Sequence, residues 1–278
     1  MENKASAKDA ELPTAQNIDL PLDRYMFTEF EIHDLSSLLL THTLACMKEH
    51  GHADTDLPEP PPLGLSKHNE RRYGITDGRL AKRLGYRTTA QSAASVRGEK
   101  KMLSADEEFT LTGGSSKPGE TGKGGKNKAG KQVPLGGCSG EALKTLGYSP
   151  TATPGNPAIV QTLNQQSFAA SLRMDSVKQA LQDWSACMRK KGYAYAAEPF
   201  SASNDRRFAT RAVTKTEKDV AVADVQCKKS SRLVETWKAE ETRIQRSLIA
   251  KHQQELEKAA KQYDATLPLI KKLSGPSA

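Results

Sequence analysis

Four cysteines are the residues whose type and spacing could do chemistry in this chain. Cys46 and Cys187 each occur in the phrase Ala-Cys-Met, five residues before a glycine that ends a predicted helix. The even count without a Cys-x-x-Cys pattern favours disulfides. Cys138 is a plausible mate for Cys46, and Cys227 for Cys187, with the latter two on an antiparallel helix pair. Four cysteines allow three connectivities, however, and the alternative is four buried free thiols.

Cys46, His50, His52 and Asp54 are the one cluster of residue types that bind metals. On a helix, Cys46 and His50 share a face at positions i and i+4, so two zinc ligands are geometrically feasible. His52 lies beyond the predicted helix end, and Tyr193 stands at the equivalent place of the second Ala-Cys-Met phrase, which favours packing. We therefore expect no metal and no other cofactor.

Three motifs resemble catalytic signatures but lack the neighbouring residues or elements that each signature requires. The segment 125–132 resembles a phosphate-binding loop, but Gln132 replaces the required Ser or Thr, and a preceding strand and a following helix are missing. The segment 136–140 would present Cys138 as a nucleophile, without a partner motif for its base. Glu240 and Glu241 lie among opposite charges, which predicts a solvated helix face. We therefore expect a non-enzyme.

The formal net charge of +8 is unevenly distributed. Residues 1–60 carry −8, so the remaining 218 residues carry +16. This asymmetry favours intramolecular compensation, and it also allows contact with an anionic partner. The candidate contact residues are the lysines of one Gly/Ser/Lys-rich segment: Lys117, Lys123, Lys126, Lys128 and Lys131. They lack interleaved aromatic residues and any known binding motif, so nucleic acid is not the favoured partner.

Helices must position these residues. A capping box at Thr28–Glu31 opens a predicted helix over about 28–50. A second box at Thr214–Glu217 opens the longest predicted helix, which keeps an apolar face for much of the way to Pro268. Further helices are predicted between Asp77 and Gly85, after Cys138, at about 156–172, and, capped by Asp175, at about 176–191. The fold class is therefore all-α, with antiparallel helices and a long C-terminal helix stapled by two disulfides.

The predicted organisation is one helical domain with flexible additions. Residues 1–19 are expected to be a disordered leader, 20–273 a single domain, and 274–278 a tail. Residues 113–137 have almost no apolar side chain to offset their ordering entropy and are expected to form a flexible loop. The chain has 36% hydrophobic and 5% aromatic residues, which predicts a modest core. No stretch approaches the ~18 apolar residues of a membrane-spanning helix.

The compartment follows from the N-terminus and the cysteines together. Residues 1–16 are polar and lack the apolar core of a signal peptide. Taken literally, this predicts a cytosolic protein; taken as a mature domain whose targeting segment has been removed, it predicts an exported one. The disulfide hypothesis favours the exported protein.

A resemblance supports the same location. In their order, several phrases resemble a family of exported proteins and lipoproteins of actinobacteria, of the Streptomyces type, over about residues 19–250. These phrases are Leu20–Phe27, Ala45–Met47, Arg71–Gly74 with Gly85–Tyr86, Cys138–Ala142, Trp184–Arg189 with Gly192–Tyr195, and Val220–Lys228 with Leu233–Trp237. The resemblance implies an extracytoplasmic location, secreted or membrane-anchored, and no established activity or catalytic residues. The chain departs from the family in showing no signal peptide or lipid-acceptor cysteine.

The expected function is therefore a non-enzymatic cell-envelope protein that binds a protein partner or an anionic envelope polymer. The alternatives are a hydrolase acting on envelope material through an unrecognised site and a cytosolic nucleic-acid-associated protein. A cleft that gathers polar groups with perturbed acidities would favour the enzyme, whereas an exposed apolar groove or a basic face would favour the binder. The cytosolic protein predicts reduced thiols.

Overall fold

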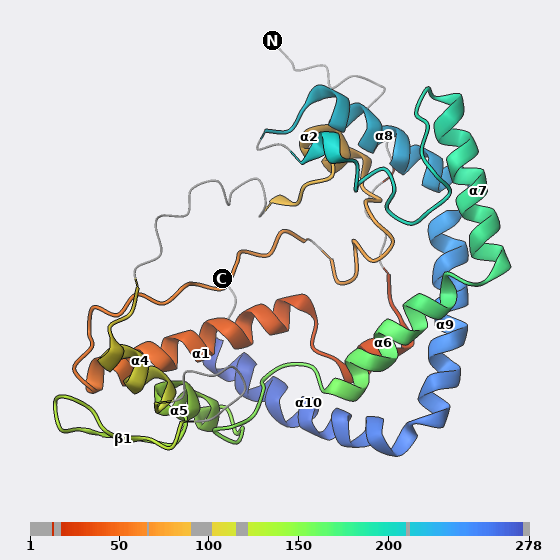
Figure 1. Cartoon of the computed structure of the whole chain (residues 1–278). Coiled ribbons are helices and arrows are strands. Elements are labelled where there is room, and N and C mark those ends of the chain that lie inside the picture. The colour runs from red at the N-terminus through yellow and green to blue at the C-terminus, as the bar shows by residue number, and fades with distance from the viewer. Residues whose placement is uncertain are drawn as a thin grey trace, which may run out of the picture. The chain divides into compact units, whose positions relative to one another are not determined.

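A computed structural model describes residue 13 and residues 18–65, 67–89, 102–114, 122–209 and 212–274. These residues are mostly helical, with two short strands (Figure 1). The predicted helical class, the two disulfides and the long C-terminal helix are confirmed.

The chain forms two compact units where the sequence predicted a single domain over 20–273. The described residues of unit 1 come from Met1–Arg24, Leu63–Val96 and Ala158–Leu256, and those of unit 2 from Tyr25–Pro62, Arg97–Pro157 and Glu257–Ala278. The physical reason is that the buried apolar side chains gather in separate clusters, with the largest one in unit 1 and another in unit 2.

Unit 1 packs its helices around two tryptophans. The rings of Tyr73 and Trp237 lie 4.9 Å apart, and Trp184 donates from Nε1 to Asp224 at 2.8 Å. Ile18 belongs to this core and is fully buried, so the predicted disordered leader ends before it; most of residues 1–17 lie outside the described part. The elements are η2 (Pro21–Tyr25), α2 (Gly78–Leu84), α6 (Ala158–Ser171), α7 (Asp175–Lys190), η4 (Arg206–Phe208), α8 (Lys215–Ser230) and α9 (Leu233–Lys251).

Local signals explain the helix starts of unit 1, with two differences from prediction. Asp77 caps α2 by accepting from the backbone N–H groups of the next turn. Asp175 is the first residue of α7, and the backbone of Met174 occupies the cap position. Thr214 caps α8, but only half of the predicted capping box forms, because the Glu217 carboxylate accepts from the Tyr86 N–H at 3.2 Å instead.

The long helix predicted from Thr214 toward Pro268 is three helices in the structure. α8 ends at Ser230, and Arg232 adopts a left-handed φ of 51° before α9. The break brings residues on both sides of it, including Val220 and Leu233, into one apolar cluster. A single straight helix would hold these residues apart along its axis. A second break at His252 precedes α10 (Gln253–Ser274), which continues through Pro268.

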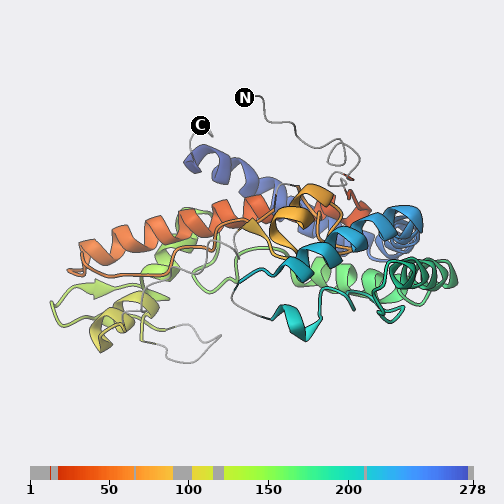
Figure 2. The same cartoon turned by 90° about the horizontal axis from the view of Figure 1, so that it is seen from above.

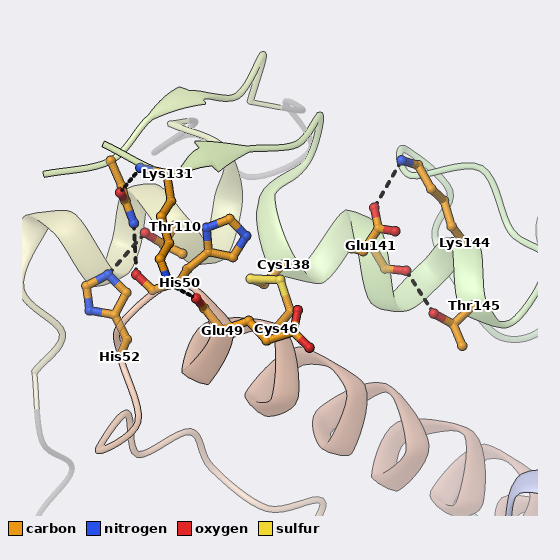
Figure 3. Close-up of a disulfide and its surroundings, with 11 residues drawn as sticks. Cys46, Glu49, His50, His52, Thr110, Lys131, Cys138, Glu141, Lys144 and Thr145 are labelled. Atoms are coloured by element: carbon orange, nitrogen blue, oxygen red, sulfur yellow. Dashed lines mark hydrogen bonds and ion pairs between the residues drawn. A yellow bond between two sulfur atoms is a disulfide. The ribbon is translucent and has the colours of Figure 1, made fainter. Parts of the chain in front are cut away.

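Unit 2 contains α1 (Glu29–Glu49), α4 (Ala105–Thr112), β1 (Gly125–Lys126), β2 (Gln132–Val133), α5 (Gly137–Thr145) and α10 from Glu257 onward. The predicted capping box opens α1, with Thr28 and Glu31 each accepting from the other's backbone N–H. α1 and α5 run antiparallel, since the disulfide joins the end of one to the start of the other (Figure 3). Their apolar faces share a cluster that includes Phe27 and Ile270.

The loop predicted to be flexible is ordered at residues 113–114 and 122–137, and residues 115–121 lie outside the described part. Residues 122–136 form a β hairpin, here called the lysine hairpin, in which Gly125 pairs with Val133 and Lys126 with Gln132. The hairpin lies beside α4 and the C-terminal end of α1 (Figures 1 and 2). Hydrogen bonds and one buried apolar side chain hold it: Asn127 donates from Nδ2 to the His50 carbonyl at 3.0 Å, and Val133 is fully buried.

Candidate functional site

The cysteines form Cys46–Cys138 and Cys187–Cys227, with Cα–Cα distances of 5.5 and 5.6 Å. These are the two pairings that the sequence made plausible. Because a disulfide sulfur is neither a thiolate nucleophile nor a thiolate ligand, Cys138 is not a nucleophile and Cys46 is not a metal ligand in this oxidised state. Cys227 and Cys138 are fully buried, so both bonds are largely internal to their units.

The metal cluster considered from the sequence does not assemble. His52 places Nε2 3.2 Å from the Thr110 hydroxyl and 3.3 Å from the Asp106 carboxylate, both on α4. His52 therefore connects the segment after α1 to α4. Asp54 is exposed. Of the sequence candidates, only His50 remains next to Cys46.

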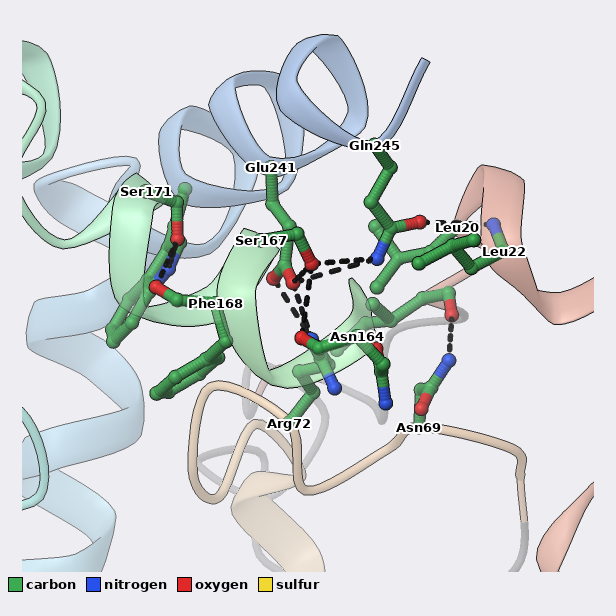
Figure 4. A network of polar contacts seen from close by, with 12 residues as sticks. Leu20, Leu22, Asn69, Arg72, Asn164, Ser167, Phe168, Ser171, Glu241 and Gln245 are labelled. Atoms are coloured by element: carbon green, nitrogen blue, oxygen red, sulfur yellow. Dashed lines mark hydrogen bonds and ion pairs between the residues drawn. The ribbon is translucent and has the colours of Figure 1, made fainter. Parts of the chain in front are cut away.

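The prediction of a solvated face for the acidic pair on α9 is wrong for Glu241. Glu241 is fully buried and accepts hydrogen bonds from Arg72 Nε at 3.1 Å and the Ser167 hydroxyl at 2.8 Å (Figure 4). It also accepts from the Tyr73 hydroxyl at 2.9 Å. Its neighbour Glu240 accepts from Ser176 and Arg243 at the unit's surface. The Glu241 carboxylate ties α6, α9 and the Arg72 segment together.

This buried network lacks the cavity that a substrate needs. Burial and the Glu241 carboxylate strongly raise the pKa of Tyr73. The neighbouring cavity, which Tyr73, Lys228 and Trp237 help to line, has a volume of about 10 Å³, room for about one water molecule. The raised pKa of Tyr73 is therefore explained by its burial and by its contact with Glu241.

An open apolar groove in unit 2 is large enough for a ligand. Its volume is about 400 Å³, within the range of small-molecule sites. Among the described residues, none of the lining side chains is ionisable: they are Leu39, Leu40, Thr43, Leu57, Pro58, Leu111, Ser139, Leu143 and Pro154. The walls therefore come from α1, the Leu57–Pro58 segment, α4, α5 and the loop after α5.

The groove lies at the edge of the apolar core of unit 2. Leu39 and Leu143 line it and also belong to the apolar cluster of that unit. Apolar walls without partner atoms forgo dispersion contacts, and a ligand that filled the groove would recover them. Sequence reasoning missed this site because its walls come from segments up to about a hundred residues apart; the run Leu38-Leu39-Leu40, wider than one helix stripe, was the available signal.

The structure separates the five lysines predicted to contact an anionic surface. Lys123, Lys126 and Lys128 are exposed on the lysine hairpin. Lys131 donates from Nζ to the Glu49 carbonyl at the C-terminal end of α1, where a cation also complements the helix dipole. Lys117 lies outside the described residues.

The lysine hairpin and the groove are built from adjoining backbone. The Gly124 N–H donates to the Gly113 carbonyl at 2.9 Å, two residues beyond Leu111 in the groove wall. Gly113 also lies against the backbone of Gly137, where any Cβ atom would clash. Glycine at position 113 therefore permits this close packing of backbone segments. α5 begins directly after the hairpin and contributes Ser139 to the groove. The backbone of the lysine hairpin thus contacts or continues into two of the elements that line the groove.

None of the helices in the described ranges is both long enough and apolar enough to cross a membrane. Comparisons with protein-family models, with curated proteins and with solved structures gave no match.

Proposed function

We propose that the protein is a non-enzymatic, extracytoplasmic component of the cell envelope that binds an anionic amphiphile, such as the lipid-bearing end of an envelope polymer. The acyl chain occupies the unit 2 groove, and the anionic head meets the exposed lysines of the hairpin. The observation that carries this proposal is an apolar groove of about 400 Å³ in the same unit as the lysine hairpin, whose backbone bonds to Gly113 at the end of the α4 wall. Two disulfides fit an oxidising compartment.

The groove supplies the main share of the affinity. Each methylene moved from water into an apolar site contributes about 0.8 kcal/mol, so about ten methylenes contribute about 8 kcal/mol before the entropy cost of association. The lysines are exposed, so they contribute mostly to the association rate and to the preference for anions, and salt weakens their effect.

The lining chemistry favours an acyl chain over a peptide. A bound peptide presents main-chain N–H and C=O groups that need partners once water is excluded. Among the lining side chains, only Thr43 and Ser139 offer a hydroxyl. An acyl chain has no polar groups that need hydrogen-bond partners. Because the lining contains no titratable side chain for acid–base work, the hydrolase alternative is also not favoured.

Isothermal calorimetry of the full oxidised chain with monomeric dodecyl phosphate tests the proposal. We expect binding at one site per chain, weaker binding of the uncharged dodecyl maltoside, and no binding of butyl phosphate, which has the head without the long chain. Raising the salt concentration should weaken dodecyl phosphate and leave the maltoside unchanged. Equal binding of butyl phosphate would place the contact on the lysines alone and refute the role of the groove.

A matched pair of substitutions locates the site. Leu40→Asp puts a carboxylate into the groove wall and should weaken dodecyl phosphate at least tenfold. Met102→Asp makes a comparable change at a side chain that is 90% exposed and outside both the lining and the lysine hairpin, and it should stay within threefold. Replacing Lys123, Lys126 and Lys128 together by Gln should abolish the salt dependence. Equal losses of affinity in the two Asp variants would refute the assignment of the binding site to the groove, provided that both variants retain the wild-type circular dichroism.

A further inference from the structure

His50 stands against the Cys46–Cys138 disulfide at the end of α1 (Figure 3). A ring nitrogen of His50 and the two sulfurs all lie within 4.8 Å of one another. The Nδ1 atom of His50 is buried and has no hydrogen-bond partner in the described structure. Most buried polar atoms are paired, so an unpaired imidazole nitrogen beside two sulfurs calls for an explanation.

We propose that reduction of this disulfide opens a metal site of the zinc type, in which the thiolates of Cys46 and Cys138 and the imidazole of His50 are the ligands. The site shares no residue with the lining of the amphiphile groove. Zinc takes such nitrogen and sulfur ligands in a tetrahedron with bonds of about 2.0 to 2.3 Å, which leaves a fourth position for water or an outside ligand. The three ligand atoms already lie within 4.8 Å of one another. To reach the tetrahedral geometry, the two sulfurs must separate after reduction and the ring of His50 must move closer to them.

The chemistry balances with a dithiol as the reductant. The dithiol supplies two electrons and two protons and becomes a disulfide, while the Cys46–Cys138 bond breaks to two thiols. Zn²⁺ then displaces one proton from each thiol into solvent, and His50 binds as the neutral imidazole. In the oxidised protein the sulfurs are not thiolates, so the site is closed.

The surrounding structure fixes the ligands in place. Cys46 lies in the last turn of α1, and His50, four residues later, is the C-cap residue of that helix, a spacing that places both side chains on the same side. The lysine hairpin holds the backbone of His50 through the bond from Asn127 Nδ2 to its carbonyl at 3.0 Å. Cys138, from the start of α5, is the third ligand, and only the fold brings it there.

The other disulfide provides a matched comparison within the same chain. Cys187–Cys227 gathers no metal-capable side chain into such a group; the Cys46, His50 and Cys138 cluster is the one found among the described residues. His52 offers a second comparison, because its ring is already held by Thr110 and Asp106. Reduction of both disulfides should therefore create one metal site.

Titration of the full chain with Co²⁺ and with Zn²⁺, before and after reduction by a phosphine that does not chelate, tests the proposal. We expect no binding by the oxidised protein. The reduced protein should bind one ion per chain, with a thiolate-to-cobalt charge-transfer band and displacement of Co²⁺ by Zn²⁺. An unchanged metal stoichiometry on reduction would overturn the proposal.

Variants distinguish a metal site formed by the folded unit from metal binding by the thiols of an unfolded chain. His50→Ala should weaken Co²⁺ binding by the reduced protein at least tenfold, whereas His52→Ala should stay within threefold. The double substitution of Cys187 and Cys227 by Ala should keep the site, and that of Cys46 and Cys138 should abolish it. If reduction merely unfolds unit 2, His50→Ala will bind as tightly as the wild type, and that result also overturns the proposal.

Discussion

Replacing Glu241 by Ala should destabilise unit 1 by about 4 kcal/mol. The substitution removes a fully buried carboxylate that pairs with Arg72 and accepts from Tyr73 and Ser167. The Arg72 side chain is only 12% exposed, so its charge would remain desolvated and without its partner. Breaking a buried ion pair by removing one member costs about 3 to 5 kcal/mol.

Its sequence neighbour supplies the control. Glu240 is adjacent on α9 and makes its ion pair with Arg243 at the surface. Surface ion pairs contribute about 0 to 1 kcal/mol, so Glu240→Ala should change the unfolding free energy by about 0.5 kcal/mol or less. The two variants remove the same side chain from neighbouring positions, and the expected results differ because the partners of Glu241 are buried whereas those of Glu240 are at the surface.

Urea unfolding followed by tryptophan fluorescence measures this difference. The chain has two tryptophans, and both Trp184 and Trp237 belong to the core of unit 1, so the signal reports on the unit that contains Glu241. A loss below about 1 kcal/mol for Glu241→Ala would refute the reasoning, because it lies below the range for a broken buried pair.

A double variant tests the cause of the loss. If the unpaired Arg72 charge dominates, Glu241→Leu combined with Arg72→Met should be more stable than Glu241→Ala alone, since both charges are gone and the volume is kept. A double variant less stable than the single one would assign the loss to packing and to the neutral hydrogen bonds.

Three further perturbations have defined outcomes. Replacing Cys187 and Cys227 by Ala should lower the unfolding free energy of unit 1 by about 3.9 kcal/mol on the chain-entropy estimate for a 40-residue loop, measured by the same urea assay. Hydrogen bonds from Arg207 hold the pKa of Asp205 well below its usual value, so this carboxylate adds stability above about pH 4 that is lost as the pH falls. The melting temperature of Asp205→Asn should therefore fall less between pH 5 and pH 3 than that of the wild type. Thr28→Ala should cost about 1 kcal/mol and speed hydrogen exchange in the first turn of α1, with exchange in α5 as the internal reference.

The helices were largely predictable because their signals are local. The capping box at Thr28 and the Asp77 cap form as the sequence predicted, since both satisfy backbone groups within three residues. The phrase Ala-Cys-Met marked two helix ends correctly, at α1 and α7. The mainly helical class followed from such signals together with the 3.6-residue periodicity.

Elements whose partners are distant were less predictable. Local apolar composition indicated a flexible loop where the lysine hairpin is, because its partners are the ends of α1 and α4. One long helix was expected where Arg232 interrupts two, because the break serves the packing of the unit 1 core. The choice among three disulfide connectivities likewise depended on which helix ends meet.

By itself, then, the sequence determined where helices start and stop and that the cysteines could pair, because hydrogen bonds between near neighbours decide these features. Only the tertiary structure decided which of two adjacent glutamates is buried, where the apolar groove opens, and that His50 faces a disulfide. Glu240 and Glu241 have nearly the same local sequence. Their difference arises because α6 and the Arg72 segment pack on one face of α9, a contact between residues far apart in the chain.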